Sequence, residues 1–391
     1  MRKVLVLDSN QRSALAIIRS LGRRGLEVLA GDPDAHSLGG SSRYAAGSVR
    51  YSDPAVAPGR FVCDVIDIAH RLSVDTVIPA TDLTTMLLVS QSDLSQIVRL
   101  AASRPASYEQ LTDKAQLIDL ASRLGIPVPE TRIARDEDAI AQAAQEFGYP
   151  VVLKPARSRY FKGEQIISTN VEIVHNSEGL ARAMGSLTWL EDISCLVQRF
   201  IPGHGAGIFA LYAPSGPIAW FAHRRIREKP PTGGVSVVSE SAPIDVTMQS
   251  AAEKLLSAVA WFGVAMVEFR VGPDATPYLM EVNGRFWGSL QLAIDAGVDF
   301  PWLLHQVIHG ASVTTPPSYA VGKRLRWLLG DFDSLLTELR RSPLGVRHKA
   351  RAIRDFLGTF VDLRCRQEVL RLHDPGPGLI ESWHWLEALF S

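Results

Sequence analysis

Two acidic side chains and an amide occupy matched positions in two apolar segments. Residues 264–270 and 278–282 have strand patterns, and the Gly-Pro-Asp turn between them predicts an antiparallel pair. This pairing brings Glu268 close to Glu281, and the two-residue repeat of a strand puts Asn283 on the same face as Glu281. Two carboxylates and an amide oxygen are ligands that Mg²⁺ prefers and that Mn²⁺ also accepts. We therefore predict a metal site here rather than two solvent-facing acids or a Glu–Arg ion pair.

Two lysines occupy positions from which they could hold phosphate groups. Lys154 ends the apolar run 151–153 and precedes a proline, so we expect a buried stem and an ammonium group that reaches into a cleft. A point charge so placed suits phosphate oxygens, although a strand-end lysine considered alone more often extends to solvent. Lys114 lies near the start of a helix, where a cation does not complement the helix dipole, and this hints at an anionic partner.

The first third of the chain alternates strand and helix patterns. The strand patterns cover residues 4–7, 26–30 and 76–78, and the helical patterns cover 12–23 and 61–72. Such alternation is typical of a parallel sheet with helices on both faces, whose ligands bind at the carboxyl ends of the strands. Asn10, Thr81 and Asp82 fall at those ends. No GxGxxG motif follows the first strand, which argues against a nicotinamide enzyme.

A different pattern begins near residue 105. Helical segments come first, then strand pairs, then a long helix before the two acidic strands. The predicted helices cover about 112–124, 137–147 and 246–262, and the predicted strands cover 165–169, 195–200, 208–212 and 218–223. From about residue 312 the chain becomes helical and basic.

Composition narrows the functional classes. The chain has 391 residues, of which 46% are hydrophobic and 21% charged, and this is typical of a globular protein with two or three domains. Because 41 Lys and Arg balance 41 Asp and Glu, we expect no general nucleic-acid binding. The three cysteines are too few and too scattered for a disulfide framework or a CxxC metal site, which favours a reducing cytoplasm.

Two segments could contact a membrane. Residues 205–222 carry no formal charge, but the turn signal at 214–217 predicts a hairpin of short strands, so we expect no transmembrane segment. A basic cluster between Arg340 and Arg354 lies beside an apolar stripe. It could lie on a membrane surface or a partner, but a packed helix with a charged outer face is the commoner structure.

The order of these motifs resembles that of the ATP-grasp superfamily, close to its carboxylate–amine ligase and carbamoyl-phosphate-synthase-like members. The motifs are Asp113-Lys114, Gly-Ile-Pro-Val-Pro at 125–129, Val-Val-Leu-Lys154-Pro, Val-Gln-Arg-Phe-Ile-Pro-Gly at 197–203, and Glu268 with Glu281-x-Asn283. The resemblance covers roughly residues 1–310. It implies an α/β and α+β protein with a parallel-sheet pre-ATP-grasp domain (1–105), a two-subdomain ATP-grasp domain (106–310, with a lid at about 125–200) and a helical C-terminal extension (311–391).

The resemblance also implies a role for each matched residue. Lys114 and Lys154 would contact ATP phosphates, and the adenine edge would be read by the backbone of Gln198, Arg199, Phe200 and Ile201. Mg²⁺ would be held by Glu268, Glu281 and Asn283. Arg285 would neutralise charge on the transferring phosphoryl group or acyl phosphate. The chain departs from the family pattern at three places. The loop after Lys154 has one glycine where relatives have a Gly-rich flap, Arg199 replaces a hinge acid, and residues 203–207 lack the acid that often holds ribose.

A basic segment over residues 223–234 allows two interpretations. Arg224 and Arg225 are the first candidates for binding the carboxylate substrate or the acyl phosphate, because arginine suits bidentate contacts to anions. A solvated basic hairpin end explains the pattern equally well.

The implied reaction is Mg-ATP-dependent ligation, in which a carboxylate is activated as an acyl phosphate and joined to an amine. The partners would be small-molecule acids and amines, and a homodimer is compatible with the sequence. Two alternatives stay open: an ATP-binding module without ligase activity, and carbamoyl-phosphate-like chemistry on bicarbonate. The latter is disfavoured because the chain contains a single ATP-grasp unit and no amidotransferase signature.

Overall fold

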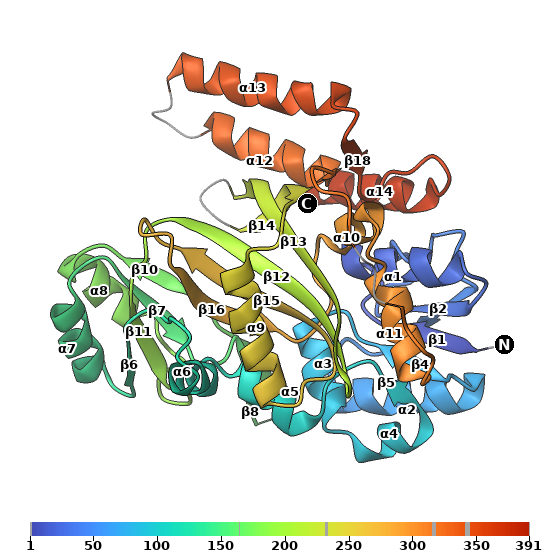
Figure 1. Cartoon of the computed structure of the whole chain (residues 1–391), viewed down its shortest axis with the longest axis horizontal. Coiled ribbons are helices and arrows are strands. Elements are labelled where there is room, and N and C mark those ends of the chain that lie inside the picture. Colours follow the sequence, from blue (N-terminus) through green and yellow to red (C-terminus); the bar gives the residue numbers. More distant parts are fainter. Residues whose placement is uncertain (1, 164, 231–233, 315–317, 341–344, 391) are drawn as a thin grey trace.

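The N-terminal part of the chain is a parallel α/β unit (Figure 1). The computed structural model describes residues 2–163, 165–230, 234–314, 318–340 and 345–390. Five strands pair in the order β3-β2-β1-β4-β5, and all neighbours run parallel, as the alternating pattern predicted. The strands are β1 (Lys3–Val6), β2 (Glu27–Asp32), β3 (Gly47–Arg50), β4 (Thr76–Ile78) and β5 (Arg99–Leu100), and the helices are α1 (Arg12–Gly22), α2 (Pro58–Leu72), α3 (Asp82–Val89) and α4 (Ser92–Ile97).

A small antiparallel sheet follows, after α5 (Pro105–Thr112) and α6 (Lys114–Arg123). Its strand order is β10-β7-β11-β6, and α7 and α8 contribute to the apolar core that it covers. The elements are β6 (Thr131–Ala134), α7 (Glu137–Phe147), β7 (Val151–Pro155), β10 (Glu172–Val174), α8 (Ser177–Met184) and β11 (Cys195–Arg199). The segment after Lys154, which we read as a loop, contains the first strand of a separate hairpin formed by β8 (Arg159–Lys162) and β9 (Gln165–Ser168).

The largest sheet has seven strands in the order β16-β15-β12-β13-β14-β17-β18. Its main strands are β12 (His204–Ala213), β13 (Gly216–Lys229), β14 (Val235–Ser241), β15 (Gly263–Val271) and β16 (Pro277–Asn283), and α9 (Val246–Ala258) packs on it. The predicted hairpin within residues 205–222 is confirmed, because β12 and β13 pair antiparallel across the turn between Ala213 and Gly216.

The C-terminal part is mainly helical, as expected, but it also extends the large sheet. Its elements are α10 (Leu290–Ala296), α11 (Phe300–Ile308), β17 (Arg324–Arg326), α12 (Leu328–Arg340), α13 (Val346–Val361), β18 (Cys365–Gln367) and α14 (Gly376–Phe390). β17 pairs with β14, and β18 pairs with β17. Charged strands of three residues give no hydrophobic alternation, so the sequence pattern could not show them.

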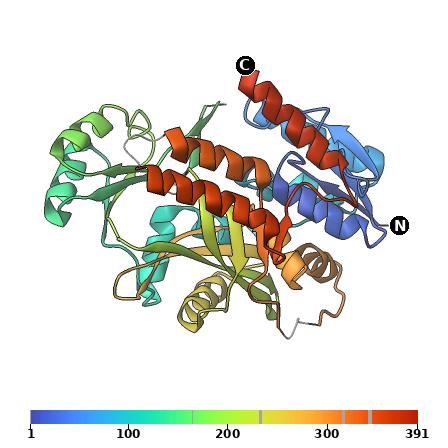
Figure 2. The same ribbon diagram turned by 90° about the horizontal axis from the view of Figure 1, so that it is seen from above.

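The helices α12 and α13 lie on the outside of the molecule, along the top in Figure 1 and facing the viewer when the molecule is seen from above in Figure 2. The buried side chain of Arg326 helps to fix α13, because its guanidinium lies over the rings of Phe356 and Phe360 and donates to Asp331. Within the described segments, no helix combines the length and apolar character needed to cross a membrane.

Candidate active site

The three predicted metal ligands come together on strands β15 and β16. Glu268 lies directly opposite Glu281, and the register shifts at the next pair, where Phe269 lies opposite Leu279. Asn283 Nδ2 is 3.0 Å from Glu268 Oε1 and 3.4 Å from Glu281 Oε1. The turn and the strand alternation therefore produce the juxtaposition that the sequence predicted.

The electrostatics of this group fit a divalent cation. Burial, reinforced by the neighbouring charge of Glu281, raises the pKa of Glu268 to about 7. The charge of Glu281 acts on Glu268, and a bound cation would relieve the repulsion between the two carboxylates. Among the residues that the structure describes, no group of three His, Cys, Asp or Glu side chains could hold a metal. The predicted donor set instead combines the two carboxylates with Asn283 Oδ1, and it requires the amide to turn, because its Nδ2 faces the glutamates here. Carboxylate and amide oxygens are hard ligands suited to Mg²⁺.

Arg225 reaches this group from a strand that is not a neighbour of β15. Its Nη2 donates to Glu268 Oε2 at 2.8 Å, and its Nη1 donates to Glu228 Oε1 at 3.0 Å. Strand β12 lies between β13 and β15, and there Gly207 stands opposite both His223 and Glu268. A Cβ at Gly205 would lie 3.9 Å from Arg225 Nη1. The two glycines leave the space through which the arginine crosses β12.

Arg224, the other predicted arginine, takes a different direction. Successive strand residues point to opposite faces of a sheet. Arg224 Nε donates to Glu240 at 2.9 Å, and Arg324 also binds Glu240. The structure therefore brings Arg225, but not Arg224, to the metal ligands.

Arg285 connects the metal ligands to the N-terminal sheet. Its Nη2 is 2.8 Å from Asp82 and 3.4 Å from Asn283 Oδ1. Asp82 is the first residue of α3, which follows the carboxyl end of β4. The sequence placed Asp82 at a ligand-binding edge, but only the structure shows that it pairs with Arg285.

Asp8 holds this edge in place, a role that the sequence analysis missed. Its carboxylate accepts hydrogen bonds from the backbone N–H groups of Ala80 and Thr81 and from the Thr84 hydroxyl. Asp8 adopts the left-handed conformation (φ 56°), and burial raises its pKa to about 6. An aspartate directly after the first strand was the available sequence signal.

Both predicted lysines are buried. Lys154 lies on β7, and burial lowers its pKa to about 8, an effect that the charge of Glu281 partly opposes. Lys114 begins α6, and its Nζ donates to Ser158 Oγ at 2.9 Å. The lysines act on each other electrostatically, because the charge of Lys114 also lowers the pKa of Lys154. Such a pair of cations suits a polyphosphate.

The predicted adenine hinge, residues 198–201, begins within the last two residues of β11. Gln198 is buried, and its Nε2 donates to Thr131 Oγ1 at 2.9 Å, whereas its Oε1 has no hydrogen-bond partner within the described chain. The Arg199 side chain turns away to Glu130 at 2.9 Å. The Phe200 N–H donates to the Pro150 carbonyl, and the Ile201 carbonyl accepts from Arg270 Nε.

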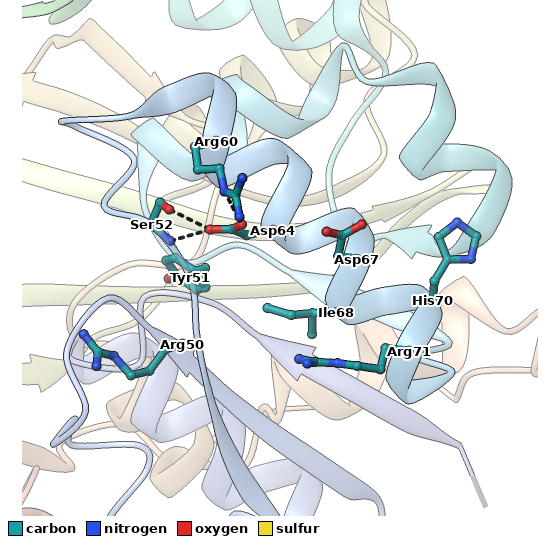
Figure 3. A pocket seen from close by; sticks show the side chains of 9 residues that line it. All are labelled: Arg50, Tyr51, Ser52, Arg60, Asp64, Asp67, Ile68, His70 and Arg71. Atoms are coloured by element: carbon teal, nitrogen blue, oxygen red, sulfur yellow. Dashed lines mark hydrogen bonds and ion pairs between the residues drawn. The ribbon is translucent and has the colours of Figure 1, made fainter.

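A cavity of about 340 Å³ opens beside the metal ligands. Its lining includes Asp82, Lys114, Ser158, Glu281 and Asn283 together with apolar side chains. A wider cavity of about 960 Å³ on the N-terminal unit shares no lining residue with this one. It is lined by Arg50, Tyr51, Ser52, Arg60, Asp64, Asp67, Ile68, His70 and Arg71, where Asp64 binds Ser52 and Arg60 (Figure 3).

Comparisons with known proteins show which family this chain resembles. The family model "ATP-grasp domain" matches residues 105–185, and the model "ATP-grasp in the biosynthetic pathway with Ter operon" matches residues 194–329. Among curated relatives, the C-terminal section of the carbamoyl phosphate synthase large chain of Methanopyrus kandleri is 31% identical over 107 residues, which are 27% of this chain and 18% of that protein. The uncharacterized protein y4rH of Sinorhizobium fredii is 25% identical over 319 residues, 75% of this chain and 62% of that protein.

The chain spans less than two thirds of both curated relatives. Among solved structures, the biotin carboxylase of Campylobacter jejuni superposes with a TM-score of 0.65 at 16% identity. The superposition covers 83% of this chain and 74% of the carboxylase chain, and it shows a likeness of fold. The two family models match consecutive segments that contain the lysines, the hinge and the paired strands with the metal ligands. The chain belongs to the ATP-grasp superfamily.

Proposed function

We propose that this protein is a Mg-ATP-dependent ligase that joins a carboxylate to an amine. The observation that carries the proposal is the convergence of Glu268, Glu281 and Asn283 with two arginines, Arg225 and Arg285. An anion-binding arginine beside a metal-ligand set is suited to hold a substrate carboxylate next to a nucleotide phosphate.

The reaction has two balanced steps. A carboxylate oxygen attacks the γ-phosphorus of ATP, so that a C–O–P linkage forms and ADP leaves. The amine nitrogen then attacks the acyl carbon, forming the C–N bond while phosphate leaves and the nitrogen loses a proton. Both steps depend mainly on positioning and on charge neutralisation, since ATP is the activated reactant of the first step and the acyl phosphate is that of the second.

Each part of the site has a proposed task. Lys114 and Lys154 bind ATP phosphates, and the backbone at 198–201 binds the adenine edge. Glu268, Glu281 and Asn283 would hold Mg²⁺, or Mn²⁺ in its place, and the ion would neutralise phosphate charge. Arg285 and Arg225 orient the acid and the acyl phosphate, and we propose that residues 125–200 act as a lid. A role for Arg224 in binding the acid or the acyl phosphate stays a prediction, because its side chain binds Glu240.

The lining of the cavity and the two arginines also bear on the two alternative functions. Bicarbonate is the acid in the carbamoyl-phosphate-like alternative, which the likeness to a carbamoyl phosphate synthase chain supports. However, the apolar part of the cavity, which includes Met86 and Val89, is not needed to hold bicarbonate. A module that only binds ATP would have no need for Arg225 and Arg285 beside the metal ligands.

The test is ADP release by the full chain with Mg-ATP, screened with pooled acids, bicarbonate and amines. We expect release only with one acid–amine combination, and loss of release in Glu281→Ala. ADP release with bicarbonate alone would support carbamoyl-phosphate-like chemistry. ATP binding without stimulation of ADP release by any acid or amine would support a module that only binds ATP. We propose a cytoplasmic location, consistent with the free cysteines Cys63, Cys195 and Cys365. Light scattering of the full chain tests the predicted homodimer.

A further inference from the structure

The cavity beside the metal ligands is amphipathic. Its polar part contains Glu281, Asn283, Lys114 and Ser158. Its other lining residues include the apolar side chains of Met86, Val89, Pro105, Leu111, Leu117 and Phe161. A site for a small polar acid or for a phosphate alone would have no need for this second part.

Helix periodicity explains how the apolar lining arises. Asp82, Met86 and Val89 lie four and three residues apart on α3, so they share one face of that helix. The same face that offers Asp82 to Arg285 therefore also offers two apolar side chains to the cavity. Met86 also packs against apolar core residues, which holds that helix face in place.

The hairpin β8–β9 supplies the remaining wall. Phe161 on β8 is 49% exposed, a large apolar side chain at the mouth of a cavity. Arg159 on the same strand also lines the cavity and has no ion-pair partner among the residues described, whereas Arg157 is bound to Asp113 and Glu109. Arg159 can therefore accept an anionic group, and Phe161 can cover an apolar one.

We propose that the acid substrate carries an apolar body, bound by Met86, Val89 and Phe161. Its carboxylate is directed to the predicted metal ligands with their arginines, Arg225 and Arg285, and Arg159 is a further cation on the cavity wall. This inference rests on the proposed ligase function and specifies its substrate class. The volume of about 340 Å³ suits an acid with a branched aliphatic or aromatic group.

The experiment compares acids of similar size and different polarity. ADP release and calorimetric binding are measured on the full chain with Mg-ATP or Mg-ADP. The apolar set is 4-methylpentanoate, 3-phenylpropanoate, leucine and phenylalanine. The polar set is glutarate, asparagine and glutamate, with bicarbonate added as a small polar acid. We expect saturable binding and stimulation from the apolar set only, in the presence of the amine pool.

Variants locate the binding site. Val89→Asp is expected to raise the KM for the acid about 10-fold or more with the Kd for ATP unchanged, since apolar pockets discriminate at this level. Phe161→Asp changes a half-exposed side chain and gives the same test if Val89→Asp does not fold. The matched control is Val56→Asp, the same change at a valine that is 80% exposed and outside the cavity.

The outcomes separate this inference from the proposed function. Stimulation by the polar set alone, or unchanged KM in both Val89→Asp and Phe161→Asp, overturns the apolar substrate class and leaves the ligase intact. ATP binding with no response to either set also overturns it. Absence of both ATP binding and ADP release would instead remove the proposed function itself.

Discussion

Arg225 and Glu268 form a 2.8 Å ion pair although a whole strand, β12, lies between the strands that carry them. The guanidinium occupies one oxygen of a carboxylate that is also a proposed metal ligand. We expect Arg225 to release Glu268 and to bind a substrate anion when a cation binds. The cation would then neutralise the charge of Glu268 in place of the arginine.

Replacement of Arg225 tests this exchange. Arg225→Ala should lower kcat about 100-fold, a loss typical of a group that stabilises developing charge. It should also tighten Mg²⁺ binding in the absence of nucleotide, because Glu268 no longer has a competing cation. Calorimetry with Mg²⁺ gives the second quantity, and weaker Mg²⁺ binding would contradict the exchange.

Two further variants separate position from charge. Gly205→Val fills the space beside Arg225 while keeping the guanidinium, so we expect a loss of activity similar in kind to that of Arg225→Ala. Arg224→Ala should cost less, since that side chain binds Glu240. An equal loss in Arg224→Ala would restore the role predicted from sequence.

The metal-ligand set predicts the response to isosteric changes. Glu281→Gln and Glu268→Gln should each weaken Mg²⁺ binding and lower activity by about 100-fold or more, because a neutral amide replaces a charged ligand. Asn283→Asp should retain Mg²⁺ binding, since an oxygen ligand remains. The control is Glu253→Gln on the exposed side of α9. Calorimetric Mg²⁺ binding curves for all four variants test the assignment of the metal ligands. Unchanged Mg²⁺ affinity in both Glu281→Gln and Glu268→Gln would reject that assignment.

The lowered pKa of Lys154 predicts a pH dependence of ATP binding. Its value of about 8 means that the free protein loses this positive charge as the pH rises through 8, whereas bound phosphate favours the charged form. The Kd for ATP should therefore rise above pH 8, by at most about tenfold per pH unit. Lys154→Arg keeps its charge to higher pH. If the variant shows the same pH dependence as the parent protein, another group is responsible.

The Asp82–Arg285 pair predicts energetic coupling between the N-terminal sheet and the metal site. Asp82→Ala should lower kcat roughly 10-fold with little change in ATP affinity, because Arg285 loses its positioning partner. In a double-mutant cycle with Arg285→Ala the two losses should not add. Additive losses would show that the residues act independently.

The cluster around Asp331 predicts the stability of the C-terminal region. Asp331 is almost fully buried and accepts hydrogen bonds from both Arg227 and Arg326. Asp331→Ala leaves two arginines without their acid and should lower the free energy of unfolding by about 3–5 kcal/mol, measured by urea denaturation. Asp355→Ala, a change at a more exposed acid on α13, should cost less than about 1 kcal/mol.

The sequence by itself determined many of the elements and the proximity of the predicted metal ligands. Alternation within one hairpin decides which residues share a face, so the proximity of Glu268, Glu281 and Asn283 followed from local rules. The buried Lys154 followed likewise, from an apolar run closed by proline. The N-terminal parallel sheet also followed, because strand and helix patterns alternate in order.

Only the tertiary structure decided which distant residues meet. The Arg225–Glu268 pair depends on strand order and on the two glycines of β12, and the Asp82–Arg285 pair depends on how two sheets pack. The strands β17 and β18 became visible only through their partners, since strands of three residues are too short to show an alternating pattern. Local periodicity carries no information about such neighbours, because they are chosen by packing rather than by spacing along the chain.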